Sequence, residues 1–201
     1  MQYTTIYIVR HGETDWNAKG LVQGHSDSPL NEAGEKQAAE LRDTLKHLHF
    51  DAVFSSDLLR AKRTAEIISL ERTLAIQTTK ALRELSFGKQ EGMEKENFLK
   101  LFKDWDKLTD KERLQIKPLP DMENGAEAAS RFITFLREVA VAFKGKTILV
   151  VSHNAIMRNF LVHLGHVSFD TFRGFKNGGY IVLKSDGIDF FIEKLEGTKV
   201  T

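Results

Sequence analysis

The sequence predicts an α/β fold: a three-layer α/β/α sandwich with a mostly parallel central sheet and an antiparallel strand at one edge. Two observations predict the parallel sheet. Strand-like runs alternate with helical patterns, and two of these runs, residues 5–9 and 147–152, are almost entirely apolar. A third observation predicts the antiparallel edge, because residues 180–184 and 189–195 flank a Ser185-Asp186-Gly187 turn.

Length and composition fit one domain, which we place at residues 1–201. Hydrophobic residues make up 41% and charged residues 28% of the 201 residues, which is ordinary for a globular protein. The net charge of +1 gives no general attraction to nucleic acid or membranes, so we expect neither as a partner, and any anion site must be local.

Several classes of protein are excluded by what the sequence lacks. No apolar run approaches the roughly 20 residues that span a bilayer, and the N-terminus does not resemble a signal peptide. There is no cysteine, which excludes disulfides, thiolate nucleophiles and cysteine-ligated zinc. We therefore expect a cytoplasmic protein.

In the first half of the chain, residues 5–9 form the first predicted strand and residues 12–30 a structured loop. Asn31 is a good cap for the helix that follows. The apolar face of that helix contains Ala38, Leu41, Leu45 and Leu48. A short strand at 52–54 leads into a second helix, for which we expect capping by Ser55, Ser56 and Asp57. We predict a strand at 74–78 and a loop at 82–92.

In the second half, residues 94–114 are predicted to be helical and form a charged insertion that extends to about residue 120, near the site. The insertion carries an aromatic stripe of Phe98, Phe102 and Trp105. We expect this stripe to pack against the body of the domain, and the alternative is a lid over an apolar substrate pocket. Residues 126–143 are the clearest helix, and another helix follows the strand at 147–152 and continues to about residue 164.

Ligands of parallel sheets bind beyond the carboxyl ends of the strands. Arg10 and His11 follow the first strand, and His153 follows the strand at 147–152. Arg60 lies in the first turn of the second helix, where the helix dipole favours anions. The topology therefore brings these four residues to one edge of the sheet.

Phosphate is the ligand that these residue types suit. The arginine fork matches phosphate oxygens. A neutral His11 can attack phosphorus, and His153, protonated by the nearby dianion, can stabilise the equatorial oxygens. The leaving oxygen needs a proton, for which Glu84 is the candidate acid. This chemistry requires no metal and no other cofactor, and the sequence offers no tight cluster of metal ligands.

An ordered set of motifs resembles the histidine phosphatase superfamily, which includes the cofactor-dependent phosphoglycerate mutases. The resemblance runs from about residue 5 to 155. Its motifs are Arg10-His11-Gly12-Glu13-Thr14, Trp16-Asn17, Gln23-Gly24, Asp27-Ser28-Pro29-Leu30, Ser55-Ser56-Asp57-Leu58-Leu59-Arg60-Ala61, Leu82 with Glu84, Glu91-Gly92 and Val151-Ser152-His153.

The resemblance implies a role for each matching residue. His11 becomes phosphorylated, Arg10, Arg60 and His153 complete the phosphate pocket, and Asn17 contributes its amide. Glu84 serves as acid to the leaving group and then as base to water. The implied fold is an α/β/α sandwich.

Candidate substrate-binding residues are Gln23, Gly24 and Asn154. Asn154 stands where the family usually has glycine, and we expect asparagine to preserve a left-handed turn there. The Gly-Gly-Glu-Ser stretch common in the family is matched only in part at residues 124–128. The identity of the substrate, beyond its being a small phosphoester, therefore stays open.

Three functions remain open. The first is a metal-independent phosphomonoester hydrolase of the histidine acid phosphatase type, acting on a small phosphorylated metabolite. The second is a 2,3-bisphosphoglycerate-dependent mutase, which the sequence disfavours because Glu84-Leu85-Ser86-Phe87-Gly88 lacks the Arg and Tyr usual in mutases. The third is a non-catalytic phosphate-recognition module, which an intact set of core residues disfavours. The oligomeric state, monomer or homodimer, stays open.

Overall fold

The computed structural model describes residues 2–200, so Met1 and Thr201, at the bounds of the predicted domain, lie outside the described residues. Its centre is a six-stranded sheet. The strands are β1 (Thr4–Arg10), β2 (Ala52–Ser56), β3 (Ile76–Thr79), β4 (Thr147–Ser152), β5 (Phe172–Ser185) and β6 (Phe190–Val200). They lie in the order β3-β2-β4-β1-β5-β6. The first four in this order are parallel, whereas β5 runs antiparallel to β1 and β6 antiparallel to β5.

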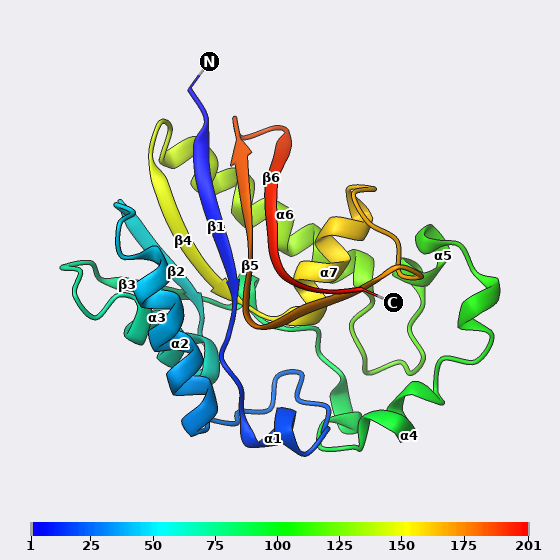
Figure 1. Ribbon diagram of the computed structural model, residues 1–201. Coiled ribbons are helices and arrows are strands. Elements are labelled where there is room, and N and C mark those ends of the chain that lie inside the picture. The colour runs from blue at the N-terminus through cyan, green and yellow to red at the C-terminus, as the bar shows by residue number, and fades with distance from the viewer. Residues whose placement is uncertain (1, 201) are drawn as a thin grey trace.

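Helices cover both faces of the sheet (Figure 1). The α-helices are α1 (Asp15–Ala18), α2 (Glu32–Leu45), α3 (Leu59–Ile68), α4 (Lys95–Leu99), α5 (Asp110–Gln115), α6 (Gly125–Ala142) and α7 (Asn154–His163). Short 3-10 turns are η1 (Lys80–Leu82), η2 (Gly88–Gln90) and η3 (Trp105–Lys107). One face of the sheet is covered by α2 and α3, and the other by α6 and α7. The predicted three-layer sandwich is confirmed.

The central strands are apolar because both of their faces are buried. On β1, Ile6 and Ile8 belong to the core beneath α6 and α7, whereas Val9 belongs to the core beneath α2 and α3. On β4, Ile148 belongs to the core beneath α6 and α7, and Leu149 belongs to the core beneath α2 and α3. Successive strand side chains point to opposite faces, so each strand contributes to both layers.

The starts of α2 and α6 both carry side-chain caps, and the one at Asn31 was predicted from the sequence. Asn31 caps α2, where its side-chain oxygen accepts a hydrogen bond from the N–H of Gly34 at 2.8 Å. Asn124 caps α6 and forms a capping box with Glu127. Such caps satisfy N–H groups that have no partner within the helix.

The start of α3 differs from the prediction. Its N-cap is Leu58, and no side chain caps it there. Asp57 instead forms a two-point ion pair with Arg83 at 2.7 Å, and Ser56 makes only a long 3.4 Å bond to the N–H of Leu58. The N–H of Leu59 donates to the carboxylate of Asp27, 2.8 Å away in the preceding loop.

Two predicted segments have other boundaries. The C-terminal hairpin extends beyond the predicted 180–195, because β5 begins at Phe172 and β6 continues to Val200 through irregular pairing. Residues 94–114 are not one helix. They break into α4, η3 and α5, with Asp104 in a left-handed conformation at φ 55°.

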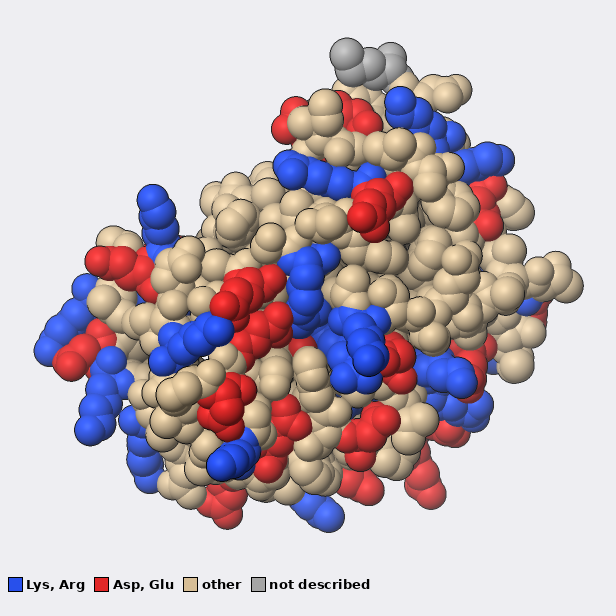
Figure 2. Space-filling model, turned by 180° about the vertical axis from the view of Figure 1, so that it is seen from behind, with Lys and Arg blue, Asp and Glu red and all other residues tan. Residues whose placement is uncertain are grey.

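Acidic and basic side chains are interspersed on the face seen from behind in Figure 2, with uncharged areas between them and a group of basic side chains near the centre. This pattern agrees with the net charge of +1. Among residues 2–200, no helix has the length and apolar content needed to cross a bilayer.

Candidate active site

The ends of β1 and β4 hold the two predicted histidines side by side. Arg10 pairs in register with Ser152, and the N–H of His11 donates to the carbonyl of Ser152 at 3.0 Å. The ring centroids of His11 and His153 lie 5.1 Å apart. Adjacent parallel strands thus bring two histidines that are far apart in the sequence to one site.

The tautomer of His11 is fixed by the backbone. Its Nδ1 lies 2.6 Å from the carbonyl oxygen of Gly12, which can only accept, so Nδ1 carries the proton and Nε2 keeps its lone pair. Burial lowers the pKa of His11 well below 6.5, and the positive charges of Arg60 and Arg10 lower it further. His11 is therefore a neutral ring at pH 7, as a nitrogen nucleophile requires.

The tautomer of His153 is fixed by Arg60. The Nε of Arg60 donates to Nδ1 of His153 at 3.2 Å, so the ring proton lies on Nε2, which is buried without a partner. Burial lowers the pKa of His153 well below 6.5, and the charge of Arg60 adds to this effect. His153 is thus a neutral donor in this structure, whereas the imidazolium that we expect would form beside a bound phosphate dianion.

The two arginines are held rigidly by backbone carbonyls. Arg60 donates to the carbonyls of Ser26 at 2.8 Å and Gly24 at 2.6 Å, and Arg10 donates to the carbonyl of Phe175. Burial lowers the pKa of each arginine to about 10, while the carboxylate of Glu84 opposes this shift. Both remain cations at pH 7, and the buried Nε of Arg10 has no hydrogen-bond partner.

The turn after β1 packs tightly against α2 and α3. A Cβ on Gly12 would collide with the carbonyl of Gly34, and a Cβ on Gly34 would collide with the carbonyl of Glu13. The N–H of Gly12 donates to the hydroxyl of Thr64, which in turn donates to the carbonyl of Arg60. This packing fixes His11 relative to Arg60.

Asn17 lies on α1 and also belongs to its capping box. Its Oδ1 accepts from the N–H of Thr14 at 3.3 Å and from Nδ2 of Asn177 at 3.3 Å. Asn177, on β5, also donates to the carbonyl of His11 at 3.0 Å. Because its Oδ1 is occupied, Asn17 presents its amide nitrogen as the group available to a ligand.

Gln23 and Gly24 lie in the loop after α1 and differ in what they offer. The side-chain Oε1 of Gln23 is buried and has no partner, so it can accept a hydrogen bond from a ligand. The carbonyl of Gly24 is occupied by Arg60. Gly24 adopts φ +56°, and a Cβ there would collide with the carboxylate of Glu91. Gly24 therefore shapes the loop that holds Arg60.

Glu84 is buried in the pocket wall, where α7 begins. Its Oε1 accepts hydrogen bonds from the N–H groups of Leu85 and Ile156, and its Oε2 accepts one from Ala155 at 2.9 Å. Oε2 thus keeps a lone pair that can carry a proton. His25 and Arg131 bind the carbonyl of Glu84 at 2.8 and 3.0 Å and fix its backbone.

Asn154 does not adopt the left-handed conformation that we expected. It is the first residue of α7, and Asp104 is the one non-glycine residue with positive φ in the described chain. Its side-chain oxygen accepts from the N–H of Phe175 at 2.8 Å. Asparagine is accommodated because its side chain links α7 to β5, and Asn154 still lines the cavity.

The expected role of the α3 dipole also needs correction. The carboxylate of Asp27 occupies the N–H of Leu59, so this helix start is already neutralised by an acidic side chain. Positive charge at the site therefore comes from the guanidinium groups of Arg10 and Arg60.

These side chains line a cavity of about 250 Å³. Every predicted site residue except His153 is on its wall: Arg10, His11, Asn17, Gln23, Gly24, Arg60, Glu84 and Asn154. His153 is completely buried next to His11. Two further residues at the site were not predicted from the sequence: Arg158, which also lines the cavity, and Asn177, which bonds to His11 and Asn17.

The site contains few groups that bind metal ions. Within residues 2–200, no group of three or more histidine, aspartate or glutamate side chains is arranged to hold one. The arginines, histidines and amides instead match the oxygens of a phosphate group.

Comparison with known proteins gives consistent matches. A family model described as the histidine phosphatase superfamily (branch 1) matches residues 6–197. The sequence is 36% identical over 161 residues to an uncharacterized phosphatase, PhoE, of Bacillus subtilis (strain 168), which covers 80% of this chain and 77% of that protein.

A second relative carries a different name. The chain is 36% identical over 148 residues to a probable phosphoglycerate mutase, GpmB, of Salmonella arizonae, covering 74% of this chain and 68% of that protein. Among solved structures, YhfR of Bacillus stearothermophilus matches with a TM-score of 0.83 at 26% identity, over 96% of both chains.

Proposed function

The chain belongs to the histidine phosphatase superfamily (branch 1), and we propose that it is a phosphomonoester hydrolase that forms a phosphohistidine at His11. The observation that supports this most strongly is the state of His11. Its Nδ1–H is bound by the Gly12 carbonyl, its ring is neutral, and it lines a cavity together with Arg10 and Arg60.

Phosphate binding follows from polar atoms that lack partners. The Nε of Arg10 and the Nε2 of His153 are both buried without a hydrogen-bond acceptor. A buried donor left unpaired costs roughly 1–3 kcal/mol. Phosphate oxygens placed between these donors would remove that cost, and the charges of Arg10 and Arg60 would neutralise the dianion.

In the first step, the lone pair on Nε2 of His11 attacks phosphorus, and the bond from phosphorus to the leaving oxygen breaks. Glu84 in its protonated form gives its proton to that oxygen, and an alcohol leaves. Arg10, Arg60 and the Nε2–H of His153 stabilise the charge on the equatorial oxygens. The product is a phosphohistidine at His11.

In the second step, water attacks the phosphohistidine. Glu84, now a carboxylate, takes a proton from the water, and the bond between phosphorus and Nε2 breaks. Inorganic phosphate leaves, His11 regains its lone pair, and Glu84 is protonated again. The fixed Nδ1–H of His11 keeps the ring in one orientation through both steps.

The main alternative is a phosphoglycerate mutase, which the name of the Salmonella arizonae relative suggests. The segment around Glu84 supports hydrolysis, because Glu84-Leu85-Ser86-Phe87-Gly88 lacks the Arg and Tyr usual in mutases.

Phosphate release from alkyl, sugar and aryl phosphoesters tests the proposal. We expect turnover that persists in EDTA, and a loss of at least about 1000-fold in His11→Asn. His166→Asn, at an exposed histidine outside the cavity, is the matched control and should retain activity. Transfer that needs a bisphosphorylated primer, with little phosphate release, would instead indicate a mutase. Phosphate binding without turnover would indicate a recognition module.

A cytoplasmic location and the oligomeric state are tested separately. We propose the cytoplasm because the sequence contains no cysteine and so no disulfide, as is common in proteins of that compartment. Cell fractionation and sedimentation of the purified protein check these two points.

A further inference from the structure

A second cavity of about 250 Å³ adjoins the one that contains His11. The two cavities share six lining residues: Phe87, Phe98, Leu99, Ala155, Arg158 and Arg173. A group bonded to a phosphate at His11 can therefore extend into the second cavity, which we term the aromatic cavity.

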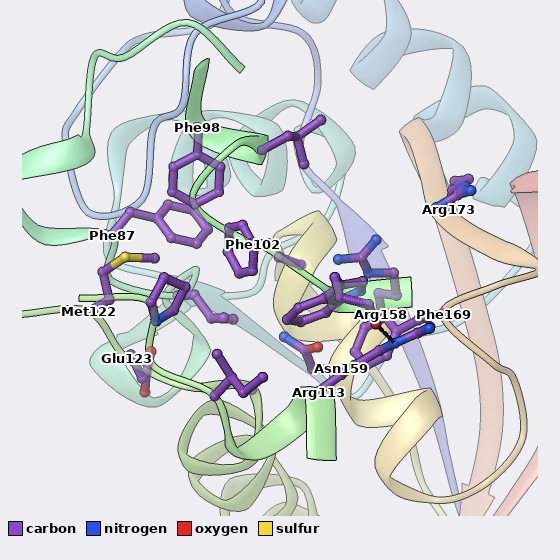
Figure 3. Close-up of a pocket in the computed structure, with 17 residues that line it drawn as sticks. Phe87, Phe98, Phe102, Arg113, Met122, Glu123, Arg158, Asn159, Phe169 and Arg173 are labelled. Carbon is purple, nitrogen blue, oxygen red and sulfur yellow. Dashed lines mark hydrogen bonds between the residues drawn. The ribbon is translucent and has the colours of Figure 1, made fainter. Parts of the chain in front are cut away.

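The aromatic cavity has one apolar wall. Its aromatic rings contact one another edge to face. The ring centroids lie 5.0 Å apart for Phe87 and Phe98, 5.2 Å for Phe98 and Phe102, and 4.9 Å for Phe102 and Trp105. Met122 lines the same side (Figure 3). The aromatic stripe of the insertion thus faces the cavity instead of only packing against the domain. Such a surface suits an apolar ring or chain.

Arg158, on α7, lies across the cavity from Phe87 and Phe98 and next to Phe169 (Figure 3). Its guanidinium sits 4.9 Å from the centroid of the Phe169 ring, and its buried Nε has no hydrogen-bond partner. Burial lowers the pKa of Arg158 to about 10, and the carboxylate of Glu84 opposes this shift. Arg158 is therefore a half-buried cation whose Nε is available to a ligand acceptor.

The other deeply placed charges of the aromatic cavity have partners. Arg113 pairs with Asp170 at 2.6 Å, and Glu123 pairs with Arg131 at 2.7 Å. Arg158 has no ion-pair partner among residues 2–200. The Glu84 carboxylate acts on Arg158 only from beyond ion-pair distance, so an anionic ligand oxygen in direct contact would satisfy the buried Nε and stabilise the cation.

We propose that the aromatic cavity binds the leaving group of the substrate, and that this group is amphiphilic: an apolar ring or chain bearing a carboxylate that pairs with Arg158. This inference rests on the proposed hydrolase function and deepens it. It makes Arg158 a residue that determines specificity and has no part in the two phosphoryl-transfer steps.

A purely structural role would leave Arg158 as a cation stacked on a ring. Arg137 shows what that role looks like, because it lies 5.8 Å from the centroid of Phe190 and its Nε donates to the carbonyl of Ile188 at 3.0 Å. The Nε of Arg158 has no such acceptor. Arg137 lines neither cavity and therefore provides a matched control.

The test compares three esters that share a ring: phenyl phosphate, 3-carbamoylphenyl phosphate and 3-carboxyphenyl phosphate. We expect the wild-type protein to hydrolyse the carboxylated ester with a kcat/KM at least about tenfold above that of its neutral carbamoyl counterpart, as for one charged hydrogen bond. We expect Arg158→Gln to abolish this preference, mainly through KM, and Arg137→Gln to retain it.

Phe102→Leu tests the apolar wall separately. It should lower kcat/KM for all three aryl esters relative to glycerol phosphate, which has no ring to place against Phe102. Circular dichroism and melting temperatures show whether each variant is folded.

The results separate this inference from the proposed function. If the wild-type protein hydrolyses the esters without preferring the carboxylate, or if Arg158→Gln keeps the preference, the inference is wrong and the hydrolase function stands. If no ester is hydrolysed and His11 is never phosphorylated, both are wrong.

Discussion

Arg60 donates from its Nε to Nδ1 of His153 at 3.2 Å, and this single bond determines which nitrogen of His153 carries the proton. The Nε2–H is consequently directed away from Arg60 and lies buried without a partner beside His11. Arg60 therefore has two effects at the site. It contributes positive charge, and it makes a neutral histidine into a hydrogen-bond donor.

Arg60→Lys should lower kcat/KM by roughly 100-fold although it keeps the charge. A compact ammonium group cannot reach the carbonyls of Ser26 and Gly24 and Nδ1 of His153 together, and each lost charged hydrogen bond is worth roughly 1.5–3 kcal/mol. Steady-state kinetics of phosphate release measures the loss. The control is Arg63→Lys, on the same helix as Arg60, where Arg63 forms an exposed ion pair with Glu35 of α2. Its kcat/KM should stay within threefold of the wild-type value. Equal activity of the two variants would refute this role.

Glu84→Gln should affect poor leaving groups much more than good ones. Glutamine keeps the shape of the side chain but has no proton to give, so turnover of an alkyl phosphate should fall by about 100-fold or more. With 2,4-dinitrophenyl phosphate, whose leaving group needs no proton, we expect a rapid burst followed by slow turnover, because no base activates water. Stopped-flow absorbance measures both phases. A uniform loss for all esters would show that Glu84 is not the acid.

The free energy of unfolding should fall as the pH drops below 6.5. Burial lowers the pKa of His11 and of His153 below 6.5, the ordinary value that they regain on unfolding. Below pH 6.5 the unfolded chain therefore binds protons that the folded protein does not, and stability decreases. Each ring contributes a slope of up to about 1.4 kcal/mol per pH unit.

Urea unfolding of the wild-type protein and of a His11→Asn/His153→Asn variant measures this contribution. Between pH 6.5 and 5.5 the variant should lose less stability than the wild-type protein, because asparagine does not titrate. The exposed His166→Asn is the control and should follow the wild type. Identical slopes for all three proteins would contradict the buried, neutral state of the two rings.

Gly34→Ala should destabilise the protein by about 2–3 kcal/mol, even though alanine favours helices by roughly 1 kcal/mol over glycine. The added Cβ would collide with the backbone of Glu13, which cannot move away without displacing the turn that holds His11. Lys36→Ala, at an exposed position of α2, should change stability by less than about 0.5 kcal/mol. Denaturant titration measures both, and a fully stable Gly34→Ala would show that the turn has room.

The sequence predicts the framework of the site well, because the relevant signals are local. An apolar strand that ends in Arg10-His11, and another that ends at His153, need only the rule for parallel sheets to be placed together. The cap at Asn31 is equally local, and the structure contains it.

The remaining features depend on tertiary packing. Arg158 looks like one polar residue on an amphipathic helix until the aromatic cavity forms around it. Asn177 lies in a glycine-rich stretch that does not resemble a strand, although β5 extends through it. The tautomer of His153 follows from the direction of one Arg60 bond, which no sequence pattern encodes.

The most direct test of the central claim is trapping of the phosphorylated protein. The protein is mixed with an aryl phosphoester, quenched within milliseconds in alkaline denaturant, which preserves phosphohistidine, and digested for mass spectrometry. The account predicts one phosphoryl group on His11, accumulating further in Glu84→Gln and absent in His11→Asn. Turnover of the ester with no phosphoryl group on His11 at any time, or full activity of His11→Asn, would contradict it.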